Sequence, residues 1–351
     1  MDFPQAGIGP TEIPRIENTI VQFEALIRRD PARRGLIGSE PRFGPLCPGD
    51  LAAASADLAQ FGSRVGIITG FYIPRGSPPA AETDGPLGSL LLAAALEGVG
   101  METFLLTDRH CLSAVRATAR AMNFDLDRVQ ELPHDSAAAR EEFFLQGLGR
   151  LLTHLIAVER VGPSHTPETL ARQQRPAPPP LERFAAQVGQ ASHGRCHKMR
   201  GEPIDEYTAN AHSLFEDAGR LRPAMKSIGI GDGGNEIGMG RILWEELERR
   251  LSGEQAGRIP CHVATDWNIV AGTSNWGAYA LAAATLLHRD ETEILRPYGR
   301  EHQHEVLHAL VTHGPAVDGV TLRREATVDG LPFLTYIQPW EGIRRLLGFA
   351  D

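Results

Sequence analysis

Hydrophobic residues follow two kinds of pattern along this chain, compact apolar runs and apolar positions that recur every three to four residues. Compact runs are typical of strands that are buried on both faces of a parallel sheet. They predict strands at residues 64–69, 102–106, 154–158, 226–230 and 261–265. The second pattern is typical of a helix with one buried face. It predicts helices at residues 16–29, 51–61, 87–96, 113–122, 136–151, 205–221, 237–251 and 275–287.

The regular alternation of strand and helix predicts the fold class. Such an order gives an α/β protein with a doubly wound, mainly parallel sheet and helices on both faces. We expect residues 1–60 to form an N-terminal helical extension packed on the main domain, and residues 61–351 to form that domain. A proline-rich insertion near residues 162–194 is expected to lie over or beside the binding site.

Charge and cysteine content narrow the function classes. The 351 residues carry 35 Lys and Arg against 44 Asp and Glu, a formal charge of −9, which disfavours contact with nucleic-acid phosphates. The four cysteines have no paired spacing, so neither a disulfide framework nor a zinc ribbon is expected. No apolar run is long enough for a membrane span, and the first residues do not resemble a signal peptide. We therefore expect a cytoplasmic protein.

Polar residues that follow the predicted strands are the first candidates for a site. Asp84 and Gly85 end the long loop after the first strand, Asp108 follows the second, Glu159 follows the third and Asp266 follows the last. The carboxyl ends of parallel strands meet in one crevice, where ligands of such folds bind. The sequence therefore predicts that these loops share one site.

The run from Gly231 to Gly240 is the most informative segment. Its five glycines allow a ligand to approach the backbone closely, and a helix after it would present free N–H groups to an anion. Asp232, Asn235 and Glu236 add side-chain oxygens that suit Mg²⁺, Mn²⁺ or an ammonium group. A turn whose polar residues cap a helix is the plainer alternative. The spacing matches neither the dinucleotide fingerprint nor a phosphate loop, so no nucleotide cofactor is expected.

Several motifs in the same order resemble the C-terminal domain of D-glutamate cyclases over roughly residues 60–330. They are ITGF at residues 68–71, ETDGPLG at 82–88, MRG at 199–201, GIGDGGNEIGMG at 229–240 and SNWG at 274–277. The resemblance implies conversion of D-glutamate to 5-oxo-D-proline with loss of water. In animals the family enzyme is mitochondrial, and this domain follows a hydro-lyase-like domain. The partners that the resemblance implies are a small amino-acid substrate and a hydro-lyase-like protein. Self-association into a homo-oligomer is a further expectation.

The resemblance and the residue chemistry together suggest roles. We expect Asp232, Glu236 and Asn235 to be catalytic, with Asp232 or Glu236 as base and Asn235 and the glycine N–H groups as donors to the developing oxyanion. Arg200 is expected to hold the substrate's α-carboxylate. The predicted metal ligands are Asp232, Glu236 and Asp266. The predicted substrate-binding residues are Asp84, Gly85, Glu159, Arg200, Gly233, Gly234, Ser274 and Asn275.

Two other functions fit the same residues. One is a magnesium-dependent enzyme that acts on a phosphate ligand held by the glycine-rich turn at residues 231–240, called the glycine turn below. The other is a non-catalytic protein that binds an amino acid and docks on a hydro-lyase-like partner.

Overall fold

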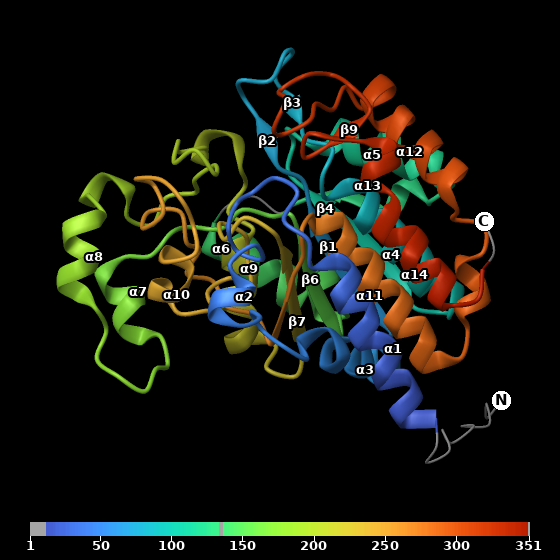
Figure 1. Ribbon diagram of the computed structural model, residues 1–351, viewed down its shortest axis with the longest axis horizontal. Coiled ribbons are helices and arrows are strands. Elements are labelled where there is room, and N and C mark those ends of the chain that lie inside the picture. The colour runs from blue at the N-terminus through green and yellow to red at the C-terminus, as the bar shows by residue number, and fades with distance from the viewer. Residues whose placement is uncertain (1–11, 133–135, 350–351) are drawn as a thin grey trace.

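A computed structural model describes residues 12–132 and 136–349 and contains a central six-stranded parallel sheet. The strand order is β5-β4-β1-β6-β7-β8, and Figure 1 labels the four central strands β4, β1, β6 and β7. All neighbouring strands in this sheet are parallel. The strands are β1 (Arg64–Thr69), β4 (Glu102–Thr107), β5 (Val129–Glu131), β6 (His154–Val158), β7 (Lys226–Gly231) and β8 (Trp267–Val270).

Both faces of the sheet are buried by helices, so the predicted doubly wound α/β fold is confirmed. Successive strand side chains point to opposite faces, and Ile67 and Ile68 of β1 accordingly belong to two different hydrophobic clusters. The larger cluster joins the sheet to helices that lie together on one side in Figure 1. These helices are α1 (Glu12–Ile27), α3 (Asp50–Phe61), α4 (Pro86–Gly98), α5 (Leu112–Ala121), α11 (Ser274–Arg289), α12 (Arg300–His313) and α14 (Gln338–Leu346).

The opposite face is covered by α6 (Ala137–Leu145), α9 (His212–Leu221) and the irregular segment 237–263. Beyond them, α7 (Pro167–Arg172) and α8 (Leu181–Gln187) of the proline-rich insertion pack with α10 (Trp244–Glu248) at the far left of Figure 1. Leu170, Phe184 and Val188 surround the buried indole of Trp244 in a small core of their own. The insertion therefore folds onto α10.

Short elements connect these layers. Two small hairpins, β2 with β3 and β9 with β10, lie outside the main sheet. The short strands and helices are α2 (Glu40–Phe43), β2 (Tyr72–Ile73), β3 (Ala80–Ala81), β9 (Thr327–Val328), β10 (Leu331–Pro332) and α13 (Phe333–Tyr336). Single 3₁₀ turns occur at Leu126–Arg128, Leu148–Arg150, Gln190–Ser192, Asp205–Tyr207 and Thr292–Leu295.

The predicted strand at residues 261–265 is wrong, because the last strand of the sheet begins at Trp267. The backbone of the predicted segment is engaged elsewhere. Cys261 donates its N–H to the carbonyl of Gly234 (2.9 Å), and His262 donates to Pro163 (2.9 Å). This apolar run therefore packs beneath the glycine turn, outside the sheet.

The helix predicted at residues 237–251 is reduced to the five residues of α10. Ile237 donates its N–H to the carbonyl of Arg160 (2.8 Å), and both Gly238 and Gly240 donate to Val263 (2.9 and 3.1 Å). These long-range bonds use the donors that a helix would need. The N-cap side chain of α11 is that of Thr273, one residue before Ser274.

The N-terminal residues share the main core. Phe23 and Ile27 of α1 are fully buried in the larger hydrophobic cluster together with Leu51 of α3. The loop between α1 and α3 continues to the carboxyl edge of the sheet, where Arg34 enters the site described below. No helix among the described residues is long and apolar enough to cross a membrane.

Candidate functional site

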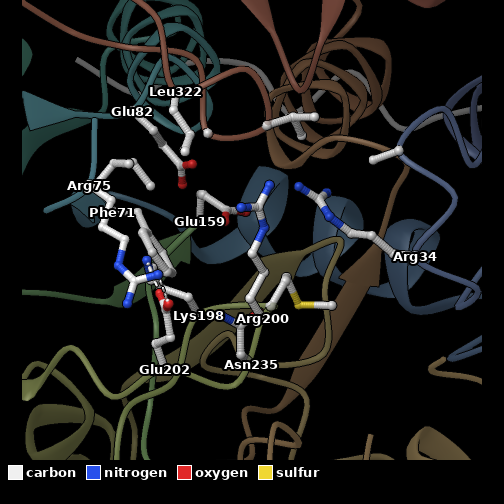
Figure 2. A pocket seen from close by; sticks show the side chains of 15 residues that line it. Arg34, Phe71, Arg75, Glu82, Glu159, Lys198, Arg200, Glu202, Asn235 and Leu322 are labelled. Atoms are coloured by element: carbon white, nitrogen blue, oxygen red, sulfur yellow. Dashed lines mark ion pairs between the residues drawn. The ribbon is translucent and has the colours of Figure 1, made fainter. Parts of the chain in front are cut away.

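The strand order creates a crevice between β1 and β6, because the chain winds away from these two central strands in opposite directions. Such a switch point is the usual ligand site of doubly wound sheets. A cavity of about 250 Å³ opens at this carboxyl edge (Figure 2). Its lining residues are Ala32, Arg34, Phe71, Ile73, Arg75, Glu82, Glu159, Lys198, Met199, Arg200, Glu202, Asn235, Gly319, Val320 and Leu322. The proline-rich insertion, expected over or beside the site, does not contribute to this lining.

Three buried carboxyl groups meet at the same edge. They belong to Asp84, Glu159 and Asp232, which lie far apart in the sequence. One carboxylate oxygen of each residue lies within 4.8 Å of an oxygen of the other two. The sequence predicted that loops after the strands would converge, and these three residues do so. Two further carboxyl groups, those of Glu82 and Asp329, are also buried and interact electrostatically with Asp84.

Asp84 is held by backbone donors at the start of α11. Its carboxylate accepts N–H bonds from Ser274 (2.8 Å) and Asn275 (2.9 Å). The side-chain oxygen of Asn275 in turn accepts from the N–H groups of Gly85 (3.0 Å) and Gly88 (2.7 Å). Gly85 has φ +98°, and a Cβ there would lie 2.7 Å from the Thr69 hydroxyl. Asn275 and Gly85, predicted to bind substrate, thus position Asp84.

Replacing Asn275 by Ala should strongly destabilise the fold. Both N–H groups that donate to its side chain are buried, and each unsatisfied buried donor costs about 1–3 kcal/mol. We expect the free energy of unfolding to fall by roughly 2–4 kcal/mol, measured by urea denaturation. Asn18→Ala, an exposed position on α1, is the control and should change it by less than about 0.5 kcal/mol. Equal effects of the two substitutions would show that the Asn275 bonds contribute little.

Glu159 follows β6 directly and lines the cavity. Ser274, also predicted to bind substrate, donates its hydroxyl to one carboxylate oxygen of Glu159 (2.5 Å) and orients that side chain. Burial, and next the charge of Glu236, raises the pKa of Glu159 well above its usual range. Burial likewise raises the pKa of Asp84 to about 7, with Asp329 as the next contribution.

The glycine turn differs from the expectation of an open anion site. Glu236 folds back and accepts N–H bonds from Asp232 (3.2 Å), Gly233 (2.6 Å) and Gly234 (2.7 Å). No helix follows the turn directly. The donors predicted for an oxyanion or a phosphate are therefore already engaged, and Glu236 shapes the turn. This removes the main support for a phosphate ligand.

Asn235 and Arg200 both line the cavity, as their predicted roles require. The amide nitrogen of Asn235 donates to the carbonyl of His197 (2.8 Å), whereas its buried oxygen has no protein partner. The side chain of Asn235 therefore offers the cavity an acceptor and not the predicted donor. In Figure 2 the exposed Arg200 side chain extends into the cavity.

Arg200 belongs to a tight turn that closes one side of the cavity. Lys198 donates its N–H to the carbonyl of Glu202 (2.9 Å) and accepts one from Gly201 (2.7 Å). Glu202 forms ion pairs with Lys198 and with Arg75 on the loop after β2, which ties the turn to that loop (Figure 2). The turn therefore places cationic side chains beside the buried carboxyl groups.

Arg34 is a site residue that the sequence did not indicate. Its guanidinium forms ion pairs with Asp232 and, at 2.7 Å, with Asp329. Burial alone would lower its pKa, but the charges of Asp232 and Asp329 outweigh burial and raise the pKa above its ordinary value. Arg34 is thus a fixed cation against the carboxyl cluster.

Glu82 is the second residue that was missed, although it opens the ETDGPLG motif. It is 6% exposed and lines the cavity, and its Oε1 atom has no protein partner. Burial, followed by the charges of Asp329 and Asp84, raises the pKa of Glu82 well above its usual range. A buried carboxyl group with a raised pKa beside a cavity is typical of proton-transfer sites.

Asp266 does not belong to this site. It accepts from the N–H and the hydroxyl of Ser227 (both 2.8 Å), near the start of β7, and it precedes β8. It therefore lies at the amino edge of the sheet, opposite the cavity. The prediction that it shares a cation with Asp232 is wrong, because it assumed a strand that ends at Thr265.

Comparison with known proteins places this chain in a family. The family model described as D-glutamate cyclase-like, C-terminal, matches residues 23–175 and 184–344. The human protein named "D-glutamate cyclase, mitochondrial" is 30% identical over 267 residues. That alignment covers 76% of this chain but only 38% of the human protein. The chain belongs to the D-glutamate cyclase-like, C-terminal family.

Proposed function

We propose that this protein cyclises D-glutamate to 5-oxo-D-proline with loss of water. The observation that carries the proposal is a cavity where buried carboxyl groups face cationic side chains, in a member of this family. Glu82 and Glu159 provide the carboxyl groups, and Lys198 and Arg200 provide the cations. Glutamate has one ammonium and two carboxylate groups, so its charges complement those of the cavity.

Ring closure joins the α-nitrogen to the γ-carbonyl carbon and breaks one C–O bond of the γ-carboxylate. The ammonium group gives up two protons, and the departing oxygen leaves with them as water. A group in the cavity must therefore accept a proton from nitrogen and deliver one to oxygen. Glu82 suits this task, because it faces the cavity with an unpartnered oxygen and burial raises its pKa.

The remaining residues bind and orient the substrate. The guanidinium of Arg200 is suited to hold the α-carboxylate through paired hydrogen bonds. The free side-chain oxygen of Asn235 is an acceptor for the ammonium group. Asp232 is paired with Arg34, so its role is to shape the charge around the cavity. This assignment moves the proton-transfer role from Asp232 and Glu236 to Glu82.

The test is incubation of the purified chain with D-glutamate, L-glutamate and D-aspartate, with 5-oxoproline separated by chromatography. We expect product from D-glutamate alone. D-aspartate is one carbon too short to form the five-membered ring, and L-glutamate tests the handedness that the proposal gives to the substrate. Thermal unfolding confirms that the sample is folded. A folded protein that forms no 5-oxoproline from D-glutamate would contradict the proposal.

A second reading follows from the length of the human relative. The chain spans 38% of that protein, and in the second reading it binds the amino acid while a hydro-lyase-like partner performs the reaction. Saturable binding of D-glutamate without turnover, and turnover once such a partner is added, would support this reading.

We further propose that the protein works in the cytoplasm, whereas the human relative is named as mitochondrial. The support is that all four cysteines are free thiols, which suits a reducing compartment. Fractionation of cells that express the protein at its natural level tests this point.

A further inference from the structure

We propose that Asp84, Glu159 and Asp232 form a binding site for one divalent cation of the Mg²⁺ or Mn²⁺ class. One oxygen from each residue lies within 4.8 Å of the other two. Carboxylates bind these hard cations at about 2.0–2.1 Å, so small side-chain movements would bring all three into one coordination shell. The site differs from the one expected from the sequence, which used Glu236 and Asp266.

The free oxygen of Asp232 is an independent indication of a ligand. Asp232 is only 4% exposed, and Arg34 pairs with its Oδ2 atom alone. Its Oδ1 atom is buried without any hydrogen-bond partner. A buried unsatisfied carboxylate oxygen is costly unless it coordinates a cation or takes a proton.

The wall of the cavity that Glu159 lines contains two more oxygens of this kind. The side-chain oxygen of Asn235, 1% exposed, and Oε1 of Glu82, 6% exposed, are both buried without a partner. Both residues line the cavity together with Glu159 (Figure 2). A hexacoordinate cation usually keeps several waters, and unpartnered acceptor oxygens in the cavity wall can hydrogen-bond to such waters.

The charge balance points the same way. Five carboxyl groups are buried together, and the cation paired with them among the described residues is Arg34, whose side chain is 14% exposed. The five are those of Glu82, Asp84, Glu159, Asp232 and Asp329. A divalent cation would stabilise the charged forms of the three ligand carboxyl groups. The site does not depend on which reaction the protein catalyses.

Direct binding of Mn²⁺ to chelator-treated protein tests this inference, by loss of the free-ion signal in electron paramagnetic resonance. We expect one Mn²⁺ per chain, displaced by excess Mg²⁺. Glu159→Gln and Asp232→Asn should each weaken Mn²⁺ binding by at least about tenfold. Even the loss of a residue that only hydrogen-bonds to a metal ligand lowers metal affinity by about 10–100-fold. Asp266→Asn, at the opposite edge of the sheet, is the matched control and should bind like the wild type.

Thermal unfolding without metal shows whether each variant is folded, and a folded variant with unchanged Mn²⁺ affinity would overturn the assignment. Absence of stoichiometric binding to the wild type would overturn it as well. Both readouts are independent of D-glutamate turnover, so failure of the cation site and failure of the proposed reaction are distinguishable.

Discussion

Glu82→Gln should lower the rate of D-glutamate turnover by about 10²–10⁴-fold, the usual contribution of a positioned proton-transfer group. The substitution keeps the shape of the side chain but removes its ability to exchange a proton. Burial already favours the neutral carboxyl group, which the amide resembles, so the fold should tolerate the change. The measurement is the initial rate of 5-oxoproline formation at saturating D-glutamate.

Glu182→Gln serves as the control for this experiment. Glu182 is an exposed residue of α8, in the insertion that packs on α10. The turnover rate and thermal stability of the Glu182→Gln variant should equal those of the wild type. If Glu82→Gln kept the wild-type rate, another group would have to transfer the proton.

Arg34→Met should lower the free energy of unfolding by about 3–5 kcal/mol, the usual effect of removing one partner from a buried ion pair. The guanidinium pairs with two buried carboxylates, Asp232 and Asp329, which would be left facing each other and Glu159. The methionine side chain retains most of the apolar volume, so the change reports mainly on charge. Urea denaturation at neutral pH measures it.

The neighbouring Arg33 provides a matched control, because its side chain is exposed in the same loop. Arg33→Met should change the free energy of unfolding by less than about 0.5 kcal/mol. A similar small change for Arg34→Met would mean that the carboxyl cluster is stable without this cation.

Local patterns predicted the architecture well where the chain forms buried parallel strands. The boundaries of β1 and β6 agree with the apolar runs at residues 64–69 and 154–158. Because the strands were predicted correctly, the sequence also predicted that Asp84, Glu159 and Asp232 lie at one edge of the sheet. Their convergence follows from parallel topology and needs no knowledge of side-chain contacts.

Long-range contacts account for what the sequence did not indicate. Arg34 pairs with Asp232 across 198 positions of sequence, and no local pattern marks such a partner. The inward fold of Glu236 depends on the shape of its own glycine turn, which composition does not specify. Asp266 was misplaced because an apolar run beneath the turn resembles a strand.

Cyclase activity of this chain alone is tested by a proton NMR time course of D-glutamate with the purified chain as the sole protein. We expect the glutamate signals to disappear and the 5-oxoproline signals to rise in a one-to-one ratio, with no change when L-glutamate is supplied. Saturable D-glutamate binding without any loss of its signals would contradict it and would identify the chain as a binding subunit.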